Sequence, residues 1–492
     1  MQLVDFLKKT ARISTSVNAI IESDSGESLT YGQLWDRVDR FACELKNLGI
    51  ESQDRVILIL PNSIDWIVSF FSILKSGGVV VPIRQSATSS ELKWIINKTK
   101  PTLFIGESSF INKSLPFDLL DDGKRVVVLG KKILVRTNGK RRINNLHDLM
   151  RGNSQVFLRD NRLVGDSDIA TINFTYRGYG YPLGAMFNSS NYIAGIKAYS
   201  HTGGIDSPRR FLSVLPFGYM YPFLGCVLVP LATGSTIIVG RTNSLHKIWD
   251  TIFKWDVNVL TGIPSFYSAL LNSSNGLDVD ALRITQAFCG GSLLPVDLYH
   301  QAKELLNIPL RQGYGLTECM AITCNPPDDN RPGTLGKTLV GADGIDVKIF
   351  NEQGVKKPIG EIGEIVISGP TIMKGYFDMP TETSEVLKNG WLYTGDLGWF
   401  DEDGYLHFSG LRKRIAKVGG NMVDLKEVEK RMLGIPGISS VNVYTSPNAR
   451  WGEVIAADIF TTSGPIDLKT IRHSLKRYLS TYKVPKILRN LS

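Results

Sequence analysis

The stretch Asp54–Ile83, DRVILILPNSIDWIVSFFSILKSGGVVVPI, decides the fold class. It begins with the short apolar run Asp54–Leu60, which is typical of a strand buried on both faces. A helical pattern follows over Ser63–Lys75 and ends before two glycines, and Val79–Ile83 is a second apolar run. Strand, helix and strand in this order predict a βαβ unit within a doubly wound, largely parallel sheet.

The composition is that of a globular protein with more than one domain: 492 residues, 43% hydrophobic and 21% charged. The net charge of +9 favours an acidic or phosphate-bearing partner, or reflects a solubilising surface. The five cysteines show no CxxC spacing, so we expect reduced thiols in a cytoplasmic protein and no zinc site. The uncharged stretch Phe211–Gly240 is interrupted by Pro and Gly, which predicts buried strands and turns and no membrane span.

A glycine-rich loop follows another predicted strand within residues 171–188, TINFTYRGYGYPLGAMFN. Gly178, Gly180 and Gly184 allow backbone N–H groups to turn inward and hold an anion such as a phosphate. The loop contains no lysine, although a phosphate cradle normally adds a cation and several hydroxyl groups. Taken alone, the pattern also suits an ordinary connection between strands that binds nothing.

The remaining segments predict a second, smaller domain and no nucleic-acid site. Basic residues cluster at 131–142, where we expect a solvated hairpin because no aromatic side chains interleave the charges. Antiparallel strands are expected over Pro358–Ser368 and Gly390–Phe408. The polar, basic segment Leu411–Val418 predicts a linker, and a helix, strand, strand, helix order over 425–479 predicts a small α+β domain.

Four separated stretches carry a resemblance to one family. They are DRVILILPNS…ILKSGGVVVPI, CGGSLLP (Cys289–Pro295), QGYGLTE (Gln312–Glu318) and YTGDLGWFDEDGYLHFSG (Tyr393–Gly410). In this order and spacing they resemble the acyl-adenylate-forming superfamily of acyl-CoA and aryl-CoA ligases, peptide-synthetase adenylation domains and luciferases. The resemblance covers nearly the whole chain. It implies a large N-terminal α/β domain (1–409) with doubly wound sheets and a distorted β subdomain, a hinge (410–413) and a small mobile α+β domain (414–492).

The resemblance also implies a reaction and a set of site residues. A carboxylic acid would react with ATP, and the acyl group would then pass from the acyl-adenylate to the thiol of CoA or of a carrier protein's phosphopantetheine. The implied cofactors are ATP or AMP, Mg²⁺, and CoA or phosphopantetheine. The implied nucleotide-binding residues are Thr175, Gly178, Gly180, Gly184, Gly290, Gly291, Tyr314, Asp396 and Arg412. Thr317 would bond a phosphate oxygen and Glu318 would hold Mg²⁺, which prefers carboxylate oxygen.

By the same resemblance, the acyl pocket would use Tyr219, Tyr221, Gly262, Ile263, Phe266 and Gly313. Lys417, with Gly419 and Gly420, would form the catalytic loop that admits the thiol arm, and Lys413 matches the hinge position. The aromatic residues of the pocket suit an aromatic or polyketide-like acyl group, although core packing would explain them as well.

Three departures from the family pattern concern adenylation. Leu183 stands at the position of the loop lysine, and Leu411 stands where the family has arginine, with Arg412 one residue later. The sequence stops at Ser492, before the Gly-Lys segment whose lysine stabilises the adenylation transition state in the family. Losing one such electrostatic group typically costs on the order of a hundredfold to a thousandfold in rate.

The sequence therefore predicts a ligase of polyketide-type secondary metabolism that joins a carboxylic acid to a phosphopantetheine thiol, with weakened adenylation. One alternative is an ATP-independent acyltransferase that moves an acyl group from CoA to a carrier protein. A second alternative is a non-catalytic scaffold that binds a carrier protein. Carrier proteins are usually acidic, which agrees with the charge of +9, and we expect neither nucleic acid nor a membrane as partner.

Overall fold

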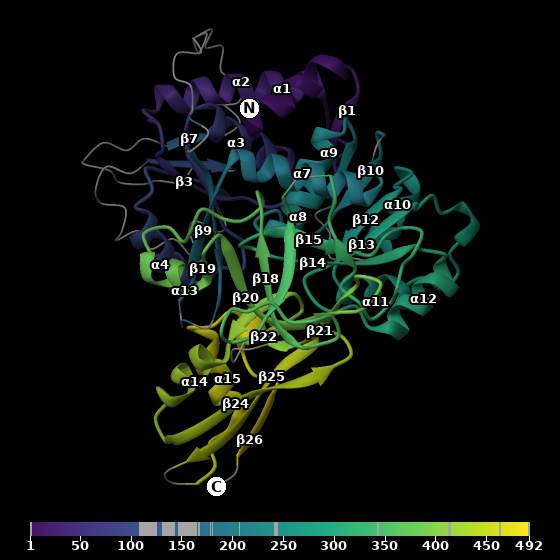
Figure 1. Ribbon diagram of the computed structural model, residues 1–492. Coiled ribbons are helices and arrows are strands. Elements are labelled where there is room, and N and C mark those ends of the chain that lie inside the picture. The colour runs from purple at the N-terminus through teal and green to yellow at the C-terminus, as the bar shows by residue number, and fades with distance from the viewer. Residues whose placement is uncertain are drawn as a thin grey trace.

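A large N-terminal domain and a smaller C-terminal domain, yellow in Figure 1, make up the computed structural model. The structure describes residues 2–107, 125–129, 143–145, 165, 168–177, 179, 181–205, 207–240, 245–341, 344–411, 415–461 and 464–490. The predicted mixed α/β fold with a large and a small domain is confirmed. The basic cluster at 131–142, together with Gly178, Gly180, Arg412 and Lys413, lies outside the described residues.

The predicted βαβ unit is present as β3 (Arg55–Ile59), α3 (Ile64–Lys75) and β4 (Val79–Pro82). The two strands pair in parallel, and α3 begins after Ser63, whose side chain accepts a hydrogen bond from the backbone N–H of Trp66. The strand order of this sheet is β7-β6-β5-β3-β4-β8-β9, with the last pair antiparallel. Its other strands are β5 (Leu103–Glu107), β6 (Arg125–Leu129), β7 (Ile143–Asn145), β8 (Ile169–Thr175) and β9 (Leu183–Asn188).

A second sheet has the order β16-β15-β14-β13-β12-β10-β11-β1-β2, and the strands from β14 to β1 in this order pair in parallel. Its strands are β1 (Asn18–Glu22), β2 (Ser28–Thr30), β10 (Arg210–Ser213), β11 (Thr236–Val239), β12 (Val259–Gly262), β13 (Gln286–Cys289), β14 (Leu310–Leu316), β15 (Met320–Cys324) and β16 (Lys337–Thr338). Because parallel strands end at one edge, the loops after β10, β12, β13 and β14 meet there. In open α/β sheets this edge is where ligands bind.

Two antiparallel sheets complete the strands. One contains β17 (Asp346–Phe350), β18 (Gly363–Ser368), β19 (Leu387–Lys388), β20 (Trp391–Phe400) and β21 (Leu406–Leu411). The other lies in the small domain and contains β22 (Ile415–Val418), β23 (Asn421–Asp424), β24 (Ile438–Asn448), β25 (Gly452–Thr461) and β26 (Ile487–Asn490), the last of which pairs in parallel. The last strand of the large domain therefore ends at Leu411, and the first strand of the small domain begins at Ile415.

The prediction of a linker over Leu411–Val418 is wrong at its C-terminal end, because β22 belongs to the small-domain sheet. Ala416 and Val418 are buried in that domain, whereas Lys417 between them lines the cavity described below. This alternation is the period-two pattern of a strand. The neighbouring basic residues obscured it in the sequence.

Helices cover the sheets of both domains (Figure 1). Those of the large domain are α1 (Leu3–Ile13), α2 (Tyr31–Asn47), α3, α4 (Ser89–Thr99), α7 (Ser189–Gly203), α8 (Met220–Phe223), α9 (Val229–Ala232), α10 (Leu245–Lys254), α11 (Pro264–Asn272), α12 (Val296–Leu306) and α13 (Pro380–Val386). Those of the small domain are α14 (Leu425–Leu433) and α15 (Leu468–Lys476).

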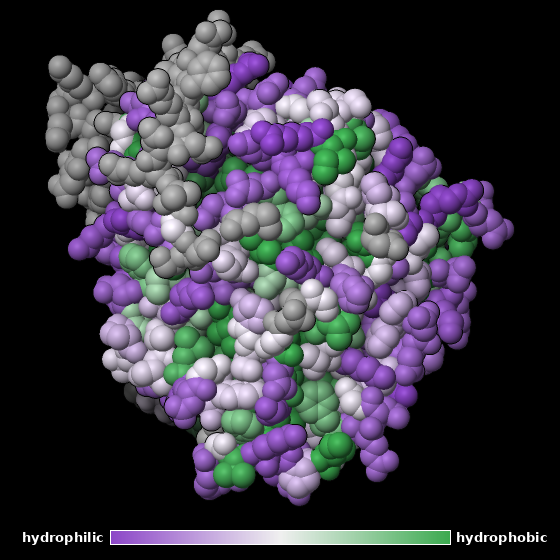
Figure 2. Space-filling model, turned by 45° about the horizontal axis from the view of Figure 1, so that its top comes forward, coloured by the Kyte–Doolittle hydropathy of each residue, from purple (hydrophilic) through white to green (hydrophobic). Residues whose placement is uncertain are grey.

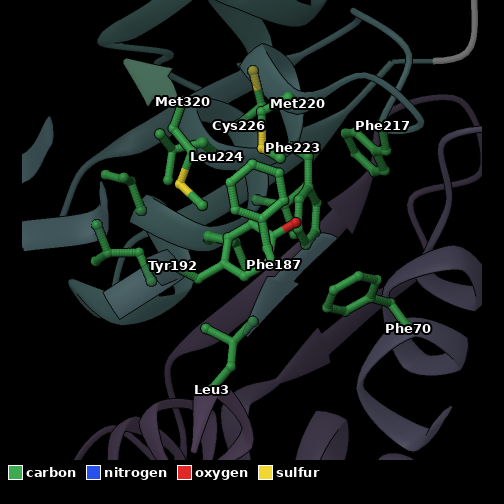
Figure 3. Packing of buried hydrophobic residues seen from close by; sticks show 14 of the residues in the cluster. Leu3, Phe70, Phe187, Tyr192, Phe217, Met220, Phe223, Leu224, Cys226 and Met320 are labelled. Atoms are coloured by element: carbon green, nitrogen blue, oxygen red, sulfur yellow. The ribbon is translucent and has the colours of Figure 1, made fainter. Parts of the chain in front are cut away.

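One continuous hydrophobic cluster packs the two large sheets and their helices together. Figure 3 shows its centre, where Phe223 of α8 lies close to Phe70 of α3 and Tyr192 of α7. The ring centroids are 4.4 Å and 5.7 Å apart, respectively, which is contact distance for aromatic pairs. This packing fixes the segment after β10, which forms one wall of the cavity.

The prediction of strands and turns throughout Phe211–Gly240 is wrong in the middle of the stretch. Between β10 and β11 the chain forms α8, a π-helical turn over Leu224–Leu228, and α9. These three elements are contiguous, and Leu228 and Val229 before Pro230 already have helical backbone angles, so the proline lies inside a helical stretch, directly after its π-helical turn. Over the part of the chain that is described, no helix has the length and hydrophobicity to cross a membrane. Figure 2 shows hydrophilic and hydrophobic residues interspersed over one face.

Candidate active site

A cavity of about 320 Å³ lies where the carboxyl ends of β10, β12, β13 and β14 meet β20 and the small domain. Most of the residues expected at the site line it: Thr175, Tyr219, Tyr221, Ile263, Gly290, Gly291, Gly313, Tyr314, Thr317, Glu318, Asp396, Lys417, Gly419 and Gly420. The fold thus brings together residues from four separated motifs and from both domains.

Three of the expected residues are described but do not line the cavity. Gly184 lies in β9, where an added Cβ would come within 2.6 Å of the Ile172 side chain, so this glycine allows close packing within the β8–β9 hairpin. Gly262 and Phe266 lie behind the wall, because a Cβ on Gly262 would come within 2.5 Å of the Phe266 ring.

The glycines after β13 allow other groups to approach the backbone closely at this edge of the cavity. A Cβ on Gly290 would lie 2.9 Å from Cζ of Tyr221, and Gly291 has a φ of +78°, which side chains rarely adopt. The Tyr221 hydroxyl donates to the backbone oxygen of Phe288 at 3.2 Å. Tyr221 is therefore held against this backbone and narrows the passage between the glycines and the apolar end of the cavity.

Asp396 and Tyr314 form a buried polar pair on the opposite side. The Tyr314 hydroxyl donates to Oδ2 of Asp396 at 2.8 Å. Burial and the neighbouring carboxylate raise the pKa of Tyr314 well above its ordinary value, so the phenol remains a donor. Lys417 of the small domain places Nζ 3.6 Å from the same oxygen. A phenol of the large domain and a lysine of the small domain therefore meet at one buried carboxylate.

Arg177, the basic residue of the glycine-rich loop that could have replaced its missing lysine, forms a second buried pair with Glu318. The Arg177 side chain places NH1 3.3 Å from Oε1 of Glu318, and the two residues are 5% and 2% exposed. NH2 of Arg177 donates to the backbone oxygens of Tyr393 and Thr394 at 3.0 Å and 2.5 Å. Burial alone would lower the pKa of Arg177, but the interactions with Tyr376 and Glu318 raise it, so the guanidinium is charged.

Glu318 has a further partner in Tyr376, whose hydroxyl donates to the same Oε1 at 2.8 Å. Burial, followed by the Glu318 charge, raises the pKa of Tyr376 well above its ordinary value, so it too stays a donor. Within the described ranges, no group of three or more His, Cys, Asp or Glu residues is arranged to hold a metal ion. Glu318 is thus a carboxylate already bonded to one cation and one hydroxyl group.

The other side chains of the loop also bond to protein. Tyr179 donates to Glu385, and Tyr181 donates to Glu382 at 2.6 Å, so α13 holds both phenols. Tyr181 stacks on Trp94 with ring centroids 4.9 Å apart. Leu183 at the lysine position is fully buried in the large core. The described part of this loop is therefore anchored to the large domain by aromatic and apolar contacts.

The remaining wall of the cavity is apolar and was not expected from the sequence. It is formed by Met220, Leu224, Phe288, Met320, Cys324 and Leu339. These residues come from α8 and the π-helical turn after it, from β13 and β15, and from the position after β16, which no local pattern would connect. A flexible, polarizable lining of this kind accommodates an apolar group of irregular shape.

The loop after β22 closes the cavity from the small domain. Gly419 and Gly420 have φ values of +54° and +82°, and the Cα of Gly420 would lie 3.6 Å from a Cβ on Gly291. The Tyr219 hydroxyl donates to Oδ1 of Asn421 at 2.7 Å across the domain boundary. The small domain is therefore docked with its glycine loop at the mouth of the cavity.

A buried group of charges fixes this docking, and we call it the interdomain charge cluster: Arg84 and Glu91 of the large domain, with Glu427 and Lys483 of the small domain. Lys483 places Nζ 3.1 Å from Oε1 of Glu91 and 3.0 Å from Oε2 of Glu427, and it is 1% exposed. Arg84 binds Glu91 at 2.8 Å. Tyr176 of the loop donates to Glu91 as well, and Lys483 lies 3.5 Å from the centroid of its ring.

Comparison with known proteins agrees with this geometry. Residues 7–377 match the family described as AMP-binding enzyme. A long-chain-fatty-acid–CoA ligase of Escherichia coli is 26% identical and aligns with 99% of this chain and 90% of its own. A feruloyl-CoA synthase of Amycolatopsis is 28% identical, with 97% and 92% covered.

Solved structures give the same result. ATP-bound MatB of Rhodopseudomonas palustris has a TM-score of 0.75 and 26% identity over 100% of this chain and 95% of its own. A double mutant of o-succinylbenzoate CoA synthetase of Bacillus subtilis has a TM-score of 0.85, and the match covers 99% of this chain and 94% of the other. At 22% sequence identity, this likeness shows a shared fold. The resemblance inferred from the four motifs is confirmed, and the chain belongs to the AMP-binding enzyme family.

Proposed function

We propose that the protein forms acyl thioesters, joining the acyl group of a carboxylic acid to a phosphopantetheine thiol of CoA or a carrier protein through an acyl-adenylate. The observation that carries this proposal is that one cavity combines three features. These are the side lined by Gly290 and Asp396, the apolar wall, and the glycine loop of the small domain. The curated relatives, which are acyl-CoA and aryl-CoA ligases, support the same reaction class.

The residues around the cavity have distinct roles in this reaction. Asp396 accepts hydrogen bonds from ribose hydroxyls, because an ionised carboxylate is a pure acceptor. Gly290 and Gly291 leave the adenine room to lie on the backbone, and Thr317 bonds a phosphate oxygen. Lys417 holds a positive charge beside the departing phosphate. ATP, when bound, supplies the leaving group that activates the carboxylate.

The thiol enters past Gly419 and Gly420, where the lack of side chains lets a pantetheine arm pass close to the backbone. Its sulfur meets the acyl carbonyl carbon inside the cavity, where both are held in place. Positioning of this kind provides a large part of the rate in reactions between two bound groups. The docked position of this loop supports the proposal that the described conformation is the one in which the thiol reacts.

We propose further that adenylation is weakened. Leu183 is buried where the family lysine would reach phosphate oxygens, and Arg177 is committed to Glu318 and to backbone oxygens. Loss of one electrostatic group of this type typically lowers the rate on the order of a hundredfold to a thousandfold. The protein then handles activated acyl groups more readily than free acids.

The acyl group is aromatic or polyketide-like. The rings of Tyr219, Tyr221 and Phe288 and the apolar wall favour stacking and apolar burial. The net charge of +9 favours an acidic carrier protein as the thiol partner, and such a pairing belongs to a biosynthetic pathway.

A second candidate is ATP-independent transfer of an acyl group from CoA to a carrier thiol. The Arg177–Glu318 ion pair favours it, because the carboxylate expected to hold a metal is already neutralised. Exchange between two thioesters is nearly thermoneutral, so it needs positioning and no triphosphate.

The test measures the intact mass of a phosphopantetheinylated carrier protein after incubation with the protein. One arm contains a free acid, ATP and Mg²⁺, and the other contains the matching acyl-CoA without ATP. We expect the carrier to gain the acyl mass in at least one arm. We also expect Tyr219→Phe, which lacks the hydrogen bond to Asn421, to raise the KM for the thiol without changing the affinity for AMP. Absence of acyl mass in both arms, over aliphatic and aromatic donors, would leave a carrier-binding scaffold and contradict the proposal.

A further inference from the structure

The cavity retains one half of a nucleotide site. Gly290, Gly291, Tyr314 and Asp396 surround the space suited to an adenosine and its first phosphate, with Thr317 and Lys417 on either side. All six residues line the cavity, with Tyr221 packed against Gly290 and with Tyr314 and Lys417 next to one oxygen of Asp396. The site therefore still suits a nucleoside monophosphate.

In the other half, which would hold a metal ion and the outer phosphates, the carboxylate is already bonded to protein groups. Glu318 Oε1 is bonded to Arg177 and Tyr376, and the Arg177 guanidinium is fixed by two backbone oxygens. A divalent cation at Glu318 does not fit beside this charged, buried guanidinium, because like charges at short range in a buried site repel strongly.

The docked small domain gives a second, independent indication. The interdomain charge cluster is buried, and Lys483 pairs with carboxylates of both domains. Tyr176 of the altered loop joins this cluster through Glu91, so the loop that would close over a triphosphate instead supports docking. A protein that performs only thiol chemistry has no need to undock for a separate adenylation step.

We infer that AMP is a recycled cofactor of this protein, which uses it to exchange acyl groups between two thiols without ATP or a metal ion. The inference rests on the proposed thioester chemistry of the same cavity and specifies which nucleotide that chemistry uses.

The exchange balances in two steps. In the first, the carbonyl carbon of the donor thioester gains a bond to a phosphate oxygen of AMP and loses its bond to sulfur, which leaves as thiolate and takes up a proton. In the second, the same carbon gains a bond to the sulfur of the acceptor thiol, whose proton is released to solvent, and loses its bond to the phosphate oxygen. AMP is regenerated, nothing is oxidised or reduced, and one thioester replaces another.

The residues of the cavity fit both steps. Lys417 balances the phosphate charge as it is consumed and regenerated, and the docked glycine loop admits the leaving and the entering thiol by the same route. The mixed anhydride stays bound between Asp396 and the apolar wall, where water is excluded and the next thiol arrives at high effective concentration.

The first measurement is equilibrium binding, which does not depend on the identity of the acyl group. Protein freed of nucleotide is titrated calorimetrically with AMP in EDTA and with ATP in Mg²⁺. We expect saturable AMP binding in EDTA and weaker binding of MgATP. Arg177→Gly removes the cation that competes with Mg²⁺ at Glu318, so Mg²⁺ should raise the affinity of this variant for ATP by about tenfold or more, an effect we do not expect in the wild type. Arg283→Gly, at an exposed loop position outside the cavity, is the matched control and should change neither affinity.

The second measurement follows acyl transfer from benzoyl-CoA or hexanoyl-CoA to pantetheine in EDTA, with and without AMP. We expect AMP to accelerate transfer by about a hundredfold or more, as a positioned reactant does, and acyl-AMP to appear by mass spectrometry. Transfer at the same rate without AMP, or transfer only from a free acid with MgATP, would overturn the inference and leave the proposed thioester function standing.

Two further outcomes are decisive. Failure of AMP to bind in EDTA would overturn the inference whatever acyl donor is chosen. Binding of AMP without transfer from either donor, when MgATP and a free acid do load pantetheine, would also overturn it. If no donor gives a thioester in any arm, the proposed function itself fails. The wild-type measurements decide the outcome even if Arg177→Gly does not fold.

Discussion

Replacing Lys483 by methionine should loosen the small domain from the large one. The substitution keeps the length of the side chain and removes the charge that binds Glu91 at 3.1 Å and Glu427 at 3.0 Å. Arg84 still neutralises Glu91, whereas Glu427 loses its ion pair with Lys483. Removing one partner of a buried ion pair typically costs about 3–5 kcal/mol. Because Arg84 still pairs with Glu91, we expect a cost at the lower end of this range, about 3 kcal/mol.

A change of that size shifts the balance between docked and undocked domains by about a hundredfold, since each 1.4 kcal/mol is about tenfold. The assay is energy transfer between dyes at exposed positions of the two domains, for example Asp24→Cys and Lys430→Cys, because the native cysteines are all buried. Lys486→Met, at an exposed position, is the matched control. Equal energy transfer and equal free energies of unfolding for Lys483→Met and Lys486→Met would refute the reasoning.

Two other predictions concern pH and the adenine side. Burial alone would raise the pKa of Glu91, but Arg84 and Lys483 outweigh it and lower the pKa from 4.5 to about 2. Glu91 therefore stabilises docking fully above pH 4.5 and loses this effect as the pH falls toward 2, so energy transfer should decrease over that range. Gly290→Ala should weaken AMP binding in calorimetry, because its Cβ would lie only 2.9 Å from a ring carbon of Tyr221. Gly434→Ala, whose Cβ would meet its nearest atom at 3.5 Å, should leave it unchanged.

Much of the fold followed from local patterns. The apolar runs and the helical pattern over Ser63–Lys75 predicted β3, α3 and β4 to within a residue or two, because burial shapes the sequence over a few positions. The strand β22 was missed because Ala416 and Val418, which are buried in the small domain, are flanked by basic residues in the sequence. The helical turns of α8 and α9 were missed because their prolines and glycines also signal turns.

The site was predictable where a motif fixes the backbone. The segments after β13 and β14 place Gly290, Tyr314 and Glu318 around one cavity, as their motifs indicated. The Arg177–Glu318 pair was not predictable, because it joins residues 141 positions apart whose contact depends on the packing of two sheets. The bond from Lys483 to Glu91 spans 392 positions and depends on how the domains dock, for which a single sequence carries no signal.

We propose an asymmetry between the two half-reactions, in which the thiol half is retained and the triphosphate half is altered at Arg177 and Leu183. The most direct measurement is quenched-flow mass spectrometry of thioester formation on pantetheine, starting either from a synthetic acyl-adenylate or from the free acid with MgATP. The first rate should exceed the second by about a hundredfold or more, the usual effect of losing one electrostatic catalytic group. Equal rates from the two starting points would contradict the account.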